Sequence, residues 1–160
     1  MTTRRRRILV IDDQEVFLRV ISAALRSMKY AVTTVTDALD GIELLQREMF
    51  DLVIVDMIMP RIGGLLAIEV IRREHRDIPI VAASAYADKL SDLLNQADID
   101  GILSKPINPR ILKRTLNDIF LKKNGTNASR SKPPTVSPKG VGSARNYRPQ
   151  RHSLGVTSPV

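Results

Sequence analysis

The chain has no cysteine and no tryptophan, and only six of its residues are aromatic. The lack of cysteine excludes disulfides, thiolate metal sites and thiol nucleophiles, and it fits a reducing compartment. So few aromatic residues leave no base-stacking surface of the kind that binds single-stranded nucleic acid. No apolar run approaches the ~20 residues that a membrane-spanning helix needs. We therefore expect a soluble, cytoplasmic protein with no membrane span.

Acidic residues are absent from residues 122–160, which hold eight Lys or Arg and five of the nine prolines. Residues 1–121 hold 17 residues of each sign, so the whole net charge of +8 lies in the last quarter of the chain. That quarter has no periodic apolar face, and it cannot bury enough surface to offset its ordering entropy. The sequence predicts one globular domain over residues 1–121 and a disordered basic tail over 122–160.

Short apolar runs alternate with helical patterns in the first 121 residues. The expected strands are 8–11, 30–35, 52–55, 79–83 and 101–104. Apolar residues at three- and four-residue spacing predict helices over 16–28, 39–49, 65–71, 90–97 and 111–119. Asn108 is a candidate N-cap for the last helix, with Pro109 at its first position and Ile111 among its inward residues. Five such units predict an α/β fold with a parallel sheet covered on both faces.

Unusual polar residues follow the expected strands. Asp12 and Asp13 come after the first strand and Asp56 after the third, while Ser84 and Lys105 follow the fourth and fifth. Taken alone, each has an ordinary structural explanation as a turn, cap or solvated loop residue. Ligands of open parallel sheets bind beyond the carboxyl ends of the strands. If these strands are neighbours, the five side chains converge on one site.

Three clustered carboxylates repel one another unless a cation compensates, and all-oxygen ligands without Cys or nearby His favour Mg²⁺. Lys105 adds a fixed positive charge and Ser84 a hydroxyl group. Carboxylate, magnesium, lysine and hydroxyl together indicate phosphoryl transfer, in which a carboxylate accepts the phosphoryl group as an acyl phosphate.

This combination resembles the receiver domain of bacterial response regulators, the CheY-like family, over about residues 6 to 121. The resemblance implies a five-stranded sheet of order 2-1-3-4-5 with helices on both faces. It implies that Asp56 is phosphorylated by a histidine kinase or a histidine phosphotransfer protein. Its further implications for the site are a magnesium ion on Asp12, Asp13, Asp56 and the backbone carbonyl of Ile58, a hydrogen bond from Ser84 to the phosphoryl group, an ion pair from Lys105, and a cis Lys105–Pro106 bond.

The sequence also departs from the family's pattern. Met59, Pro60 and Gly64 match the loop after the phosphoacceptor, but Gly63 stands where Asp is common. More important, Ile102 stands where the family usually has Tyr or Phe. An isoleucine cannot make the same inward swing, so we expect weaker coupling between the site and the face formed by helix four, strand five and helix five. Tyr86 either influences the phosphoryl lifetime or only covers its loop.

Three other functions fit less well. A phosphatase of the haloacid-dehalogenase type needs a second Asp two residues after the nucleophile, where this chain has Ile58. A dinucleotide or flavin binder needs a glycine-rich first turn, where this chain has two acids. A receiver that is never phosphorylated is supported only by Ile102.

No output domain is visible, because a helix-turn-helix or catalytic effector needs ~60 or more structured residues. We therefore expect a stand-alone regulator in a two-component phosphorelay, which signals by altered contacts with a downstream protein and is not a dedicated turnover enzyme. The basic tail is able to contact nucleic acid, an acidic protein or an anionic membrane. A solvated extension without a partner is the favoured interpretation.

Overall fold

The fold of the chain is given by a computed structural model, which describes residues 4–87, 89 and 99–129. Nine helices and strands are assigned within these residues. In chain order they are β1 (Arg7–Ile11), α1 (Glu15–Ser27), β2 (Ala31–Val35), α2 (Ala38–Arg47), β3 (Leu52–Asp56), α3 (Gly64–Glu74), β4 (Ile80–Ser84), β5 (Gly101–Ser104) and α5 (Pro109–Ser129).

The five strands form one parallel sheet in the order β2-β1-β3-β4-β5, as expected from the resemblance. Strands β3 and β4 are buried along their whole length, since both have a strand on each side and helices over both faces. Their continuous apolar sequences follow from this position.

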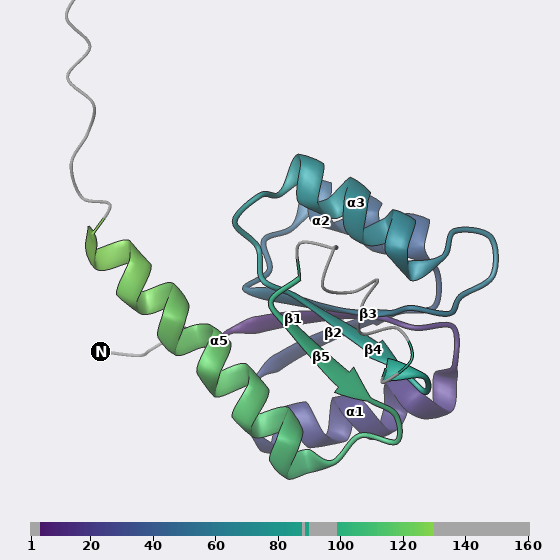
Figure 1. The fold of residues 1–160 in the computed structure, drawn as a ribbon, viewed down its shortest axis with the longest axis horizontal. Coiled ribbons are helices and arrows are strands. Elements are labelled where there is room, and N and C mark those ends of the chain that lie inside the picture. The colour runs from purple at the N-terminus through teal and green to yellow at the C-terminus, as the bar shows by residue number, and fades with distance from the viewer. Residues whose placement is uncertain (1–3, 88, 90–98, 130–160) are drawn as a thin grey trace, which may run out of the picture.

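Alternate residues of each strand point to opposite faces, so the sheet has two cores. Ile8 and Val10 of β1 pack with α1 and α5, whereas Leu9 and Ile11 pack with α2 and α3. Figure 1 shows the same arrangement, with α2 and α3 above the sheet and α1 and α5 below it. The predicted doubly covered parallel sheet is confirmed.

The helix starts follow the capping residues in two cases. The Asn108 side chain accepts a hydrogen bond from the backbone N–H of Arg110 at 2.9 Å, so the predicted N-cap of α5 is confirmed. Asp37 caps α2 in the same way, through the N–H of Leu39 at 2.8 Å. Helix α1 has no side-chain cap at Gln14.

The apolar stripe of two helices is narrower than the sequence pattern indicates. In α1, Leu18, Ile21 and Leu25 are buried, while Val16 and Val20 are exposed. In α5, the prediction that Ile111 faces inward is wrong. Ile111 is exposed, whereas the next residue, Leu112, is buried.

Helix α5 extends to Ser129, so the predicted domain boundary at residues 121 and 122 falls inside a helix. The first eight residues assigned to the basic tail are therefore helical. In Figure 1 the end of α5 projects past the amino edge of the sheet. The predicted helix over 90–97 and the rest of the predicted tail lie outside the described residues.

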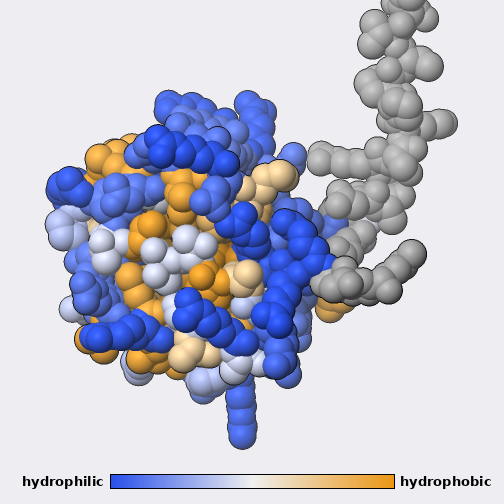
Figure 2. All heavy atoms as spheres, turned by 180° about the vertical axis from the view of Figure 1, so that it is seen from behind, coloured by the Kyte–Doolittle hydropathy of each residue, from blue (hydrophilic) through white to orange (hydrophobic). Residues whose placement is uncertain are grey.

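The face seen in Figure 2 is the reverse of Figure 1, on the side of the edge strand β2. Apolar and weakly polar side chains gather at its centre, and hydrophilic ones surround them. A shallow hollow between α1 and β2 is lined by Leu18, Arg19 and Thr34, among others. Within the part of the chain that the structure describes, none of the helices has the length and apolar character needed to cross a bilayer.

Candidate functional site at the carboxyl edge of the sheet

The strand ends bring the predicted side chains together. Asp12 directly follows β1, and its N–H donates to the carbonyl of Val35 at 3.1 Å. Asp56 ends β3 and pairs with Ala83 of β4, one residue before Ser84. Ser84 in turn pairs with Ser104, the residue before Lys105. All four strands end at one edge because the sheet is parallel and in register.

Lys105 joins the two buried aspartates. Its Nζ lies 2.6 Å from Oδ2 of Asp12 and 3.0 Å from Oδ1 of Asp56. The contact with Asp12 is an ion pair. Asp12 is fully buried and Asp56 is 2% exposed, so one ammonium group serves two desolvated carboxylates.

The third carboxylate, of Asp13, is exposed at the mouth of the site. One oxygen each from Asp12, Asp13 and Asp56 lies within 4.8 Å of the others, the one such group within the described residues that could hold a metal ion. The Oδ2 atom of Asp56 is buried and has no hydrogen-bond partner in the part of the chain that the structure describes. Three carboxylates with a spare oxygen suit a hard cation such as Mg²⁺, which uses a few carboxylates and keeps several waters.

Burial raises the pKa of the Asp56 carboxyl above its usual value. The hydrogen bond from Lys105 opposes this shift, the negative charge of Asp12 adds to it, and the N–H of Ile58 lowers the pKa slightly. The carboxylate of Asp56 is thus costly to keep ionised without additional positive charge. A group in this condition is a candidate for chemistry rather than for stability.

The loop after β3 holds Asp56 from behind. The backbone of Gly64 lies so close to it that an added Cβ would be 2.1 Å from the Asp56 carbonyl oxygen. Ile58 follows in this loop and is 53% exposed. Its carbonyl remains the predicted further magnesium ligand.

Ser84 is buried at the end of β4. Its hydroxyl oxygen accepts a hydrogen bond from the N–H of Tyr86 at 3.0 Å, and its carbonyl accepts one from the N–H of Lys105 at 2.9 Å. The Lys105–Pro106 peptide bond is cis, as the resemblance implied. Ser84 and Lys105 are therefore tied to each other by the backbone next to Asp56.

Ile102 and Tyr86, the two residues that the sequence links to switching and to the phosphoryl lifetime, lie on β5 and just after β4. Ile102 is partly buried and packs with the core on the α2 and α3 side, opposite Ala82 of β4. Tyr86 is 54% exposed, and Nζ of Lys89 lies 5.8 Å from the centre of its ring.

Sequence reasoning missed one side chain of the site. The ring of Phe17, in the first turn of α1, lies 4.3 Å from Nζ of Lys105. The apolar spacing of α1 marked Phe17 as a core residue, and it does pack partly against the core. Its position four residues after Asp13 was the available signal, because a helix that begins beyond a strand end places its first turn beside the site.

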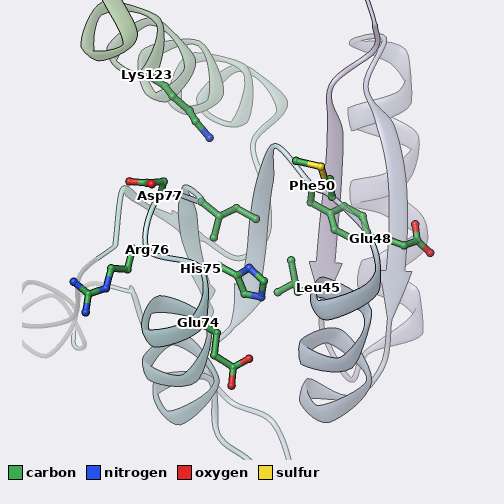
Figure 3. Close-up of a pocket in the computed structure, with 10 residues that line it drawn as sticks. Leu45, Glu48, Phe50, Glu74, His75, Arg76, Asp77 and Lys123 are labelled. Carbon is green, nitrogen blue, oxygen red and sulfur yellow. The ribbon is translucent and has the colours of Figure 1, made fainter. Parts of the chain in front are cut away.

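A cavity of about 400 Å³ lies at the amino edge of the sheet, beside the C-terminal ends of α2 and α3. Figure 3 shows His75 near its centre, between Leu45 and Glu74, with Lys123 of α5 above. Nε2 of His75 is buried, and residues 4–87, 89 and 99–129 offer it no hydrogen-bond partner. This cavity holds none of the side chains predicted from the strand ends.

The sequence matches the family described as response regulator receiver domain over residues 8–117. It is 32% identical over 111 residues to the sensor histidine kinase RcsC of Salmonella typhimurium, which covers 68% of this chain and 12% of the kinase. It is 28% identical over 126 residues to the probable transcriptional regulator ycf27 of Cyanidium caldarium, which covers 78% of this chain and 50% of the regulator. The chain thus spans about half or less of the length of these relatives.

Two solved structures with similar sequences are receiver proteins with magnesium. The receiver domain of the sensor histidine kinase PA1611 from Pseudomonas aeruginosa has a magnesium ion coordinated in its active site cleft. It is 31% identical, with a TM-score of 0.68, and the match covers 73% of this chain and 98% of that one. The response regulator TrrA from Thermotoga maritima, in complex with Mg²⁺ and BeF, is 30% identical, with a TM-score of 0.66 over 71% of this chain and 98% of that one.

Proposed function

Because the chain belongs to the family of response regulator receiver domains, we propose that it accepts a phosphoryl group on Asp56 from a phosphohistidine. The observation that carries this proposal is the state of the Asp56 carboxylate. It is buried, one oxygen contacts Lys105, and the other oxygen lies beside two further carboxylates and has no hydrogen-bond partner among the described residues. Such a desolvated carboxylate costs stability rather than adding to it.

In the proposed reaction, an oxygen of Asp56 attacks phosphorus, the phosphorus–nitrogen bond of the donor breaks, and the histidine leaves with the electron pair of that bond. The product is an acyl phosphate on Asp56. Lys105 already lies 3.0 Å from this carboxylate, so it is placed to neutralise the added negative charge. The hydroxyl of Ser84 would donate a hydrogen bond to a phosphoryl oxygen, because its oxygen only accepts in the contact with Tyr86.

Asp12, Asp13 and Asp56, with the carbonyl of Ile58, are the residues that would hold Mg²⁺. When bound, the ion supplies positive charge that offsets repulsion between the carboxylates and the transferred group. The magnesium-bound neighbours and the geometry of the three carboxylates support this assignment.

We further propose a signalling role rather than that of a dedicated enzyme. The donor is a histidine kinase or a histidine phosphotransfer protein in the cytoplasm, and the output is an altered contact with a downstream protein. Similarity to receiver regions of sensor kinases supports a place in a phosphorelay. Contact between the basic tail and nucleic acid is not part of this proposal.

Incubation with acetyl phosphate and Mg²⁺, followed by intact mass measurement, tests the proposal. The wild type gains the mass of one phosphoryl group, and the gain disappears with a chelator and in Asp56→Asn. The matched control is Asp51→Asn, an aspartate at the opposite edge of the sheet, which keeps the mass gain. A gain that persists in Asp56→Asn contradicts the proposal. No gain in a well-folded wild type would favour a receiver that acts without phosphorylation.

A further inference from the structure

Lys105 is held on three sides by groups from three different elements. Two are the carboxylates of Asp12 after β1 and Asp56 on β3. The third is the aromatic ring of Phe17 on α1, whose centre lies 4.3 Å from Nζ. The lysine side chain is only 10% exposed, so this cation–π contact is largely removed from water. Such contacts are stronger when desolvated.

The ring is itself fixed from behind. Phe17 lies in the first turn of α1 and packs against the core between the sheet, α1 and α5. Within that core, Leu18 and Ile21 of the same helix are buried. The ring therefore has the support of a packed helix, whereas the lysine is a flexible four-carbon chain with a charge at its end.

The ring differs chemically from the two carboxylates in a way that matters for phosphoryl transfer. When Asp56 becomes an acyl phosphate, the lysine loses one carboxylate partner and new anionic oxygens arrive. A cation held by the three aspartates would share the carboxylate of Asp12 with the lysine. The face of a neutral ring attracts the ammonium in all of these states, and because the ring has no net charge it adds no ionic charge beside the phosphoryl group and the metal ligands.

We propose that Phe17 is a positioning residue for phosphoryl transfer, which keeps the Lys105 ammonium directed at Asp56 through a cation–π contact. This inference rests on the proposed phosphorylation of Asp56. It adds a residue that acts through Lys105 and touches neither the phosphoryl donor nor the metal.

Fluorinated phenylalanines placed at position 17 alone test this role. One, two and three fluorine atoms on the ring progressively weaken the negative potential of its face while its volume changes little. We expect the maximal rate of phosphorylation by acetyl phosphate to fall stepwise, by about three- to tenfold for the trifluoro ring. The half-saturating concentration of acetyl phosphate should change little, because the ring does not contact the donor. Phe17→Leu should show a similar loss, and Phe17→Tyr should restore most of the rate.

A matched control is available at the other edge of the sheet. The guanidinium of Arg7 lies 4.8 Å from the centre of the Phe50 ring, a contact of the same kind away from the site. The same fluorinated series at Phe50 should leave the phosphorylation rate unchanged. Urea unfolding of each protein shows whether either series alters stability.

An NMR measurement without any donor gives an independent result. Protons near Nζ of Lys105 lie over the face of the ring, so they should be shifted upfield in the wild type and return to ordinary positions in Phe17→Leu. A wild type that is phosphorylated normally, with a flat fluorine series at Phe17, overturns the positioning role and leaves the proposed function intact. Absence of phosphorylation in the wild type contradicts the proposed function instead, and the upfield shift then still tests the contact between the ring and Lys105.

Discussion

The two edges of the sheet use charged residues in opposite ways. At the carboxyl edge, Asp12 and Asp56 are buried and share one lysine. At the amino edge, arginines and acids of the described residues form ion pairs that are less buried. The pairs are Arg4 with Asp51 at 2.9 Å, Arg72 with Asp100 at 3.1 Å, and Arg7 with Glu48.

The comparison separates reactivity from stability. Ion pairs near the surface contribute little each, about 0–1 kcal/mol, and salt screens them. Buried carboxylates in excess over their cations destabilise the fold, because desolvation is only partly offset. The buried negative charge at the carboxyl edge is therefore costly for the fold and fits the proposed binding of a cation there, whereas the ion pairs at the amino edge contribute modestly to stability.

The largest change in the free energy of unfolding is expected at Gly64, where the backbone of the carboxyl edge is most tightly packed. An added Cβ at Gly64 would lie 2.1 Å from the Asp56 carbonyl oxygen and 2.6 Å from the Cα of Met57. Both atoms belong to the backbone, so the strand end must shift in Gly64→Ala. We expect a loss of about 3 kcal/mol in the free energy of unfolding, at the upper part of the overpacking range. Urea unfolding measures it.

Gly63 is the matched control for Gly64. A Cβ there meets nothing within 4 Å. Its backbone is at φ −64°, which any residue adopts. Gly63→Ala should change the free energy of unfolding by less than about 0.5 kcal/mol. Equal losses in the two variants would contradict the proposed close packing behind Asp56.

The second prediction removes one negative charge from the carboxyl edge. In Asp56→Asn, Lys105 keeps its ion pair with Asp12 while a desolvated charge is lost, so the fold should gain on the order of 1 kcal/mol with a chelator present. The raised pKa of Asp56 sets the pH dependence. At pH values between the usual pKa of 3.8 and the raised pKa, Asp56 takes up a proton when the chain folds. The free energy of unfolding of the wild type therefore falls as pH rises through that window.

The gain of Asp56→Asn should therefore be complete above the raised pKa of Asp56 and vanish below the usual value, where both side chains are neutral. Thermal unfolding across this range measures it. Added Mg²⁺ should stabilise the wild type more than the variant, because binding to the native state alone shifts the folding equilibrium. A variant less stable than the wild type at neutral pH would show that the charge of Asp56 is fully compensated.

The third prediction concerns how far a change at the carboxyl edge spreads. Ile102 lies on β5 opposite Ala82, and it is smaller than an aromatic residue and stiff at χ1. A beryllofluoride mimic of the acyl phosphate should therefore produce small amide shift changes over residues 99–104 and larger ones near Tyr86. Ile102→Tyr should enlarge the changes on β5. Large shifts there in the wild type, unaltered by Tyr86→Ala, would contradict this prediction.

Much of the fold and the carboxylate cluster could be predicted, because both depend on local patterns. Continuous β-branched strands, helical spacing and polar residues directly after the strands specify a parallel sheet with a polar edge. An acid that directly follows a strand then lies at this polar edge. The meeting of Asp12 and Asp56 with Lys105 needs only the strand order as further information.

Features that depend on contacts between elements could not be predicted in this way. An aromatic residue at helical spacing indicates core, and nothing local shows that the Phe17 ring also faces Lys105. The run of four arginines indicates a solvated patch, yet Arg6 lies 4.0 Å from the centre of the Phe120 ring and Arg4 pairs with Asp51. These partners are 114 and 47 positions away in the sequence.

The fourth prediction tests the amino edge by the same removal of charge. Asp51 accepts a hydrogen bond from the N–H of Arg7 at 2.7 Å as well as its ion pair with Arg4. Asn keeps the acceptor and loses the pair, so Asp51→Asn should cost about 0.5 kcal/mol at low salt and less in high salt. A loss of stability in Asp51→Asn and a gain in Asp56→Asn, both measured by thermal unfolding, would confirm the contrast between the two edges. Stabilisation by both would remove it.

The smallest effect is expected at the end of α5, where sequence and structure differ. Residues 122–129 include two Lys, two Asn and one Gly, which indicates a chain without fixed structure, whereas the structure continues the helix to Ser129. A helix that is already formed gains one hydrogen bond for each residue added to it, so weak helix propensity alone does not end it.

Gly125 has no described atom within 4 Å of an added Cβ, and alanine favours the interior of a helix over glycine by about 1 kcal/mol. Because helix ends fray, only part of this difference is expected at residue 125. Gly125→Ala should therefore add about 0.3–0.5 kcal/mol to the free energy of unfolding and increase the helical circular dichroism signal. Gly63→Ala, outside the body of any helix, serves as the control, and no change in either quantity for Gly125→Ala would place the end of the helix before residue 125, close to the boundary that composition indicates.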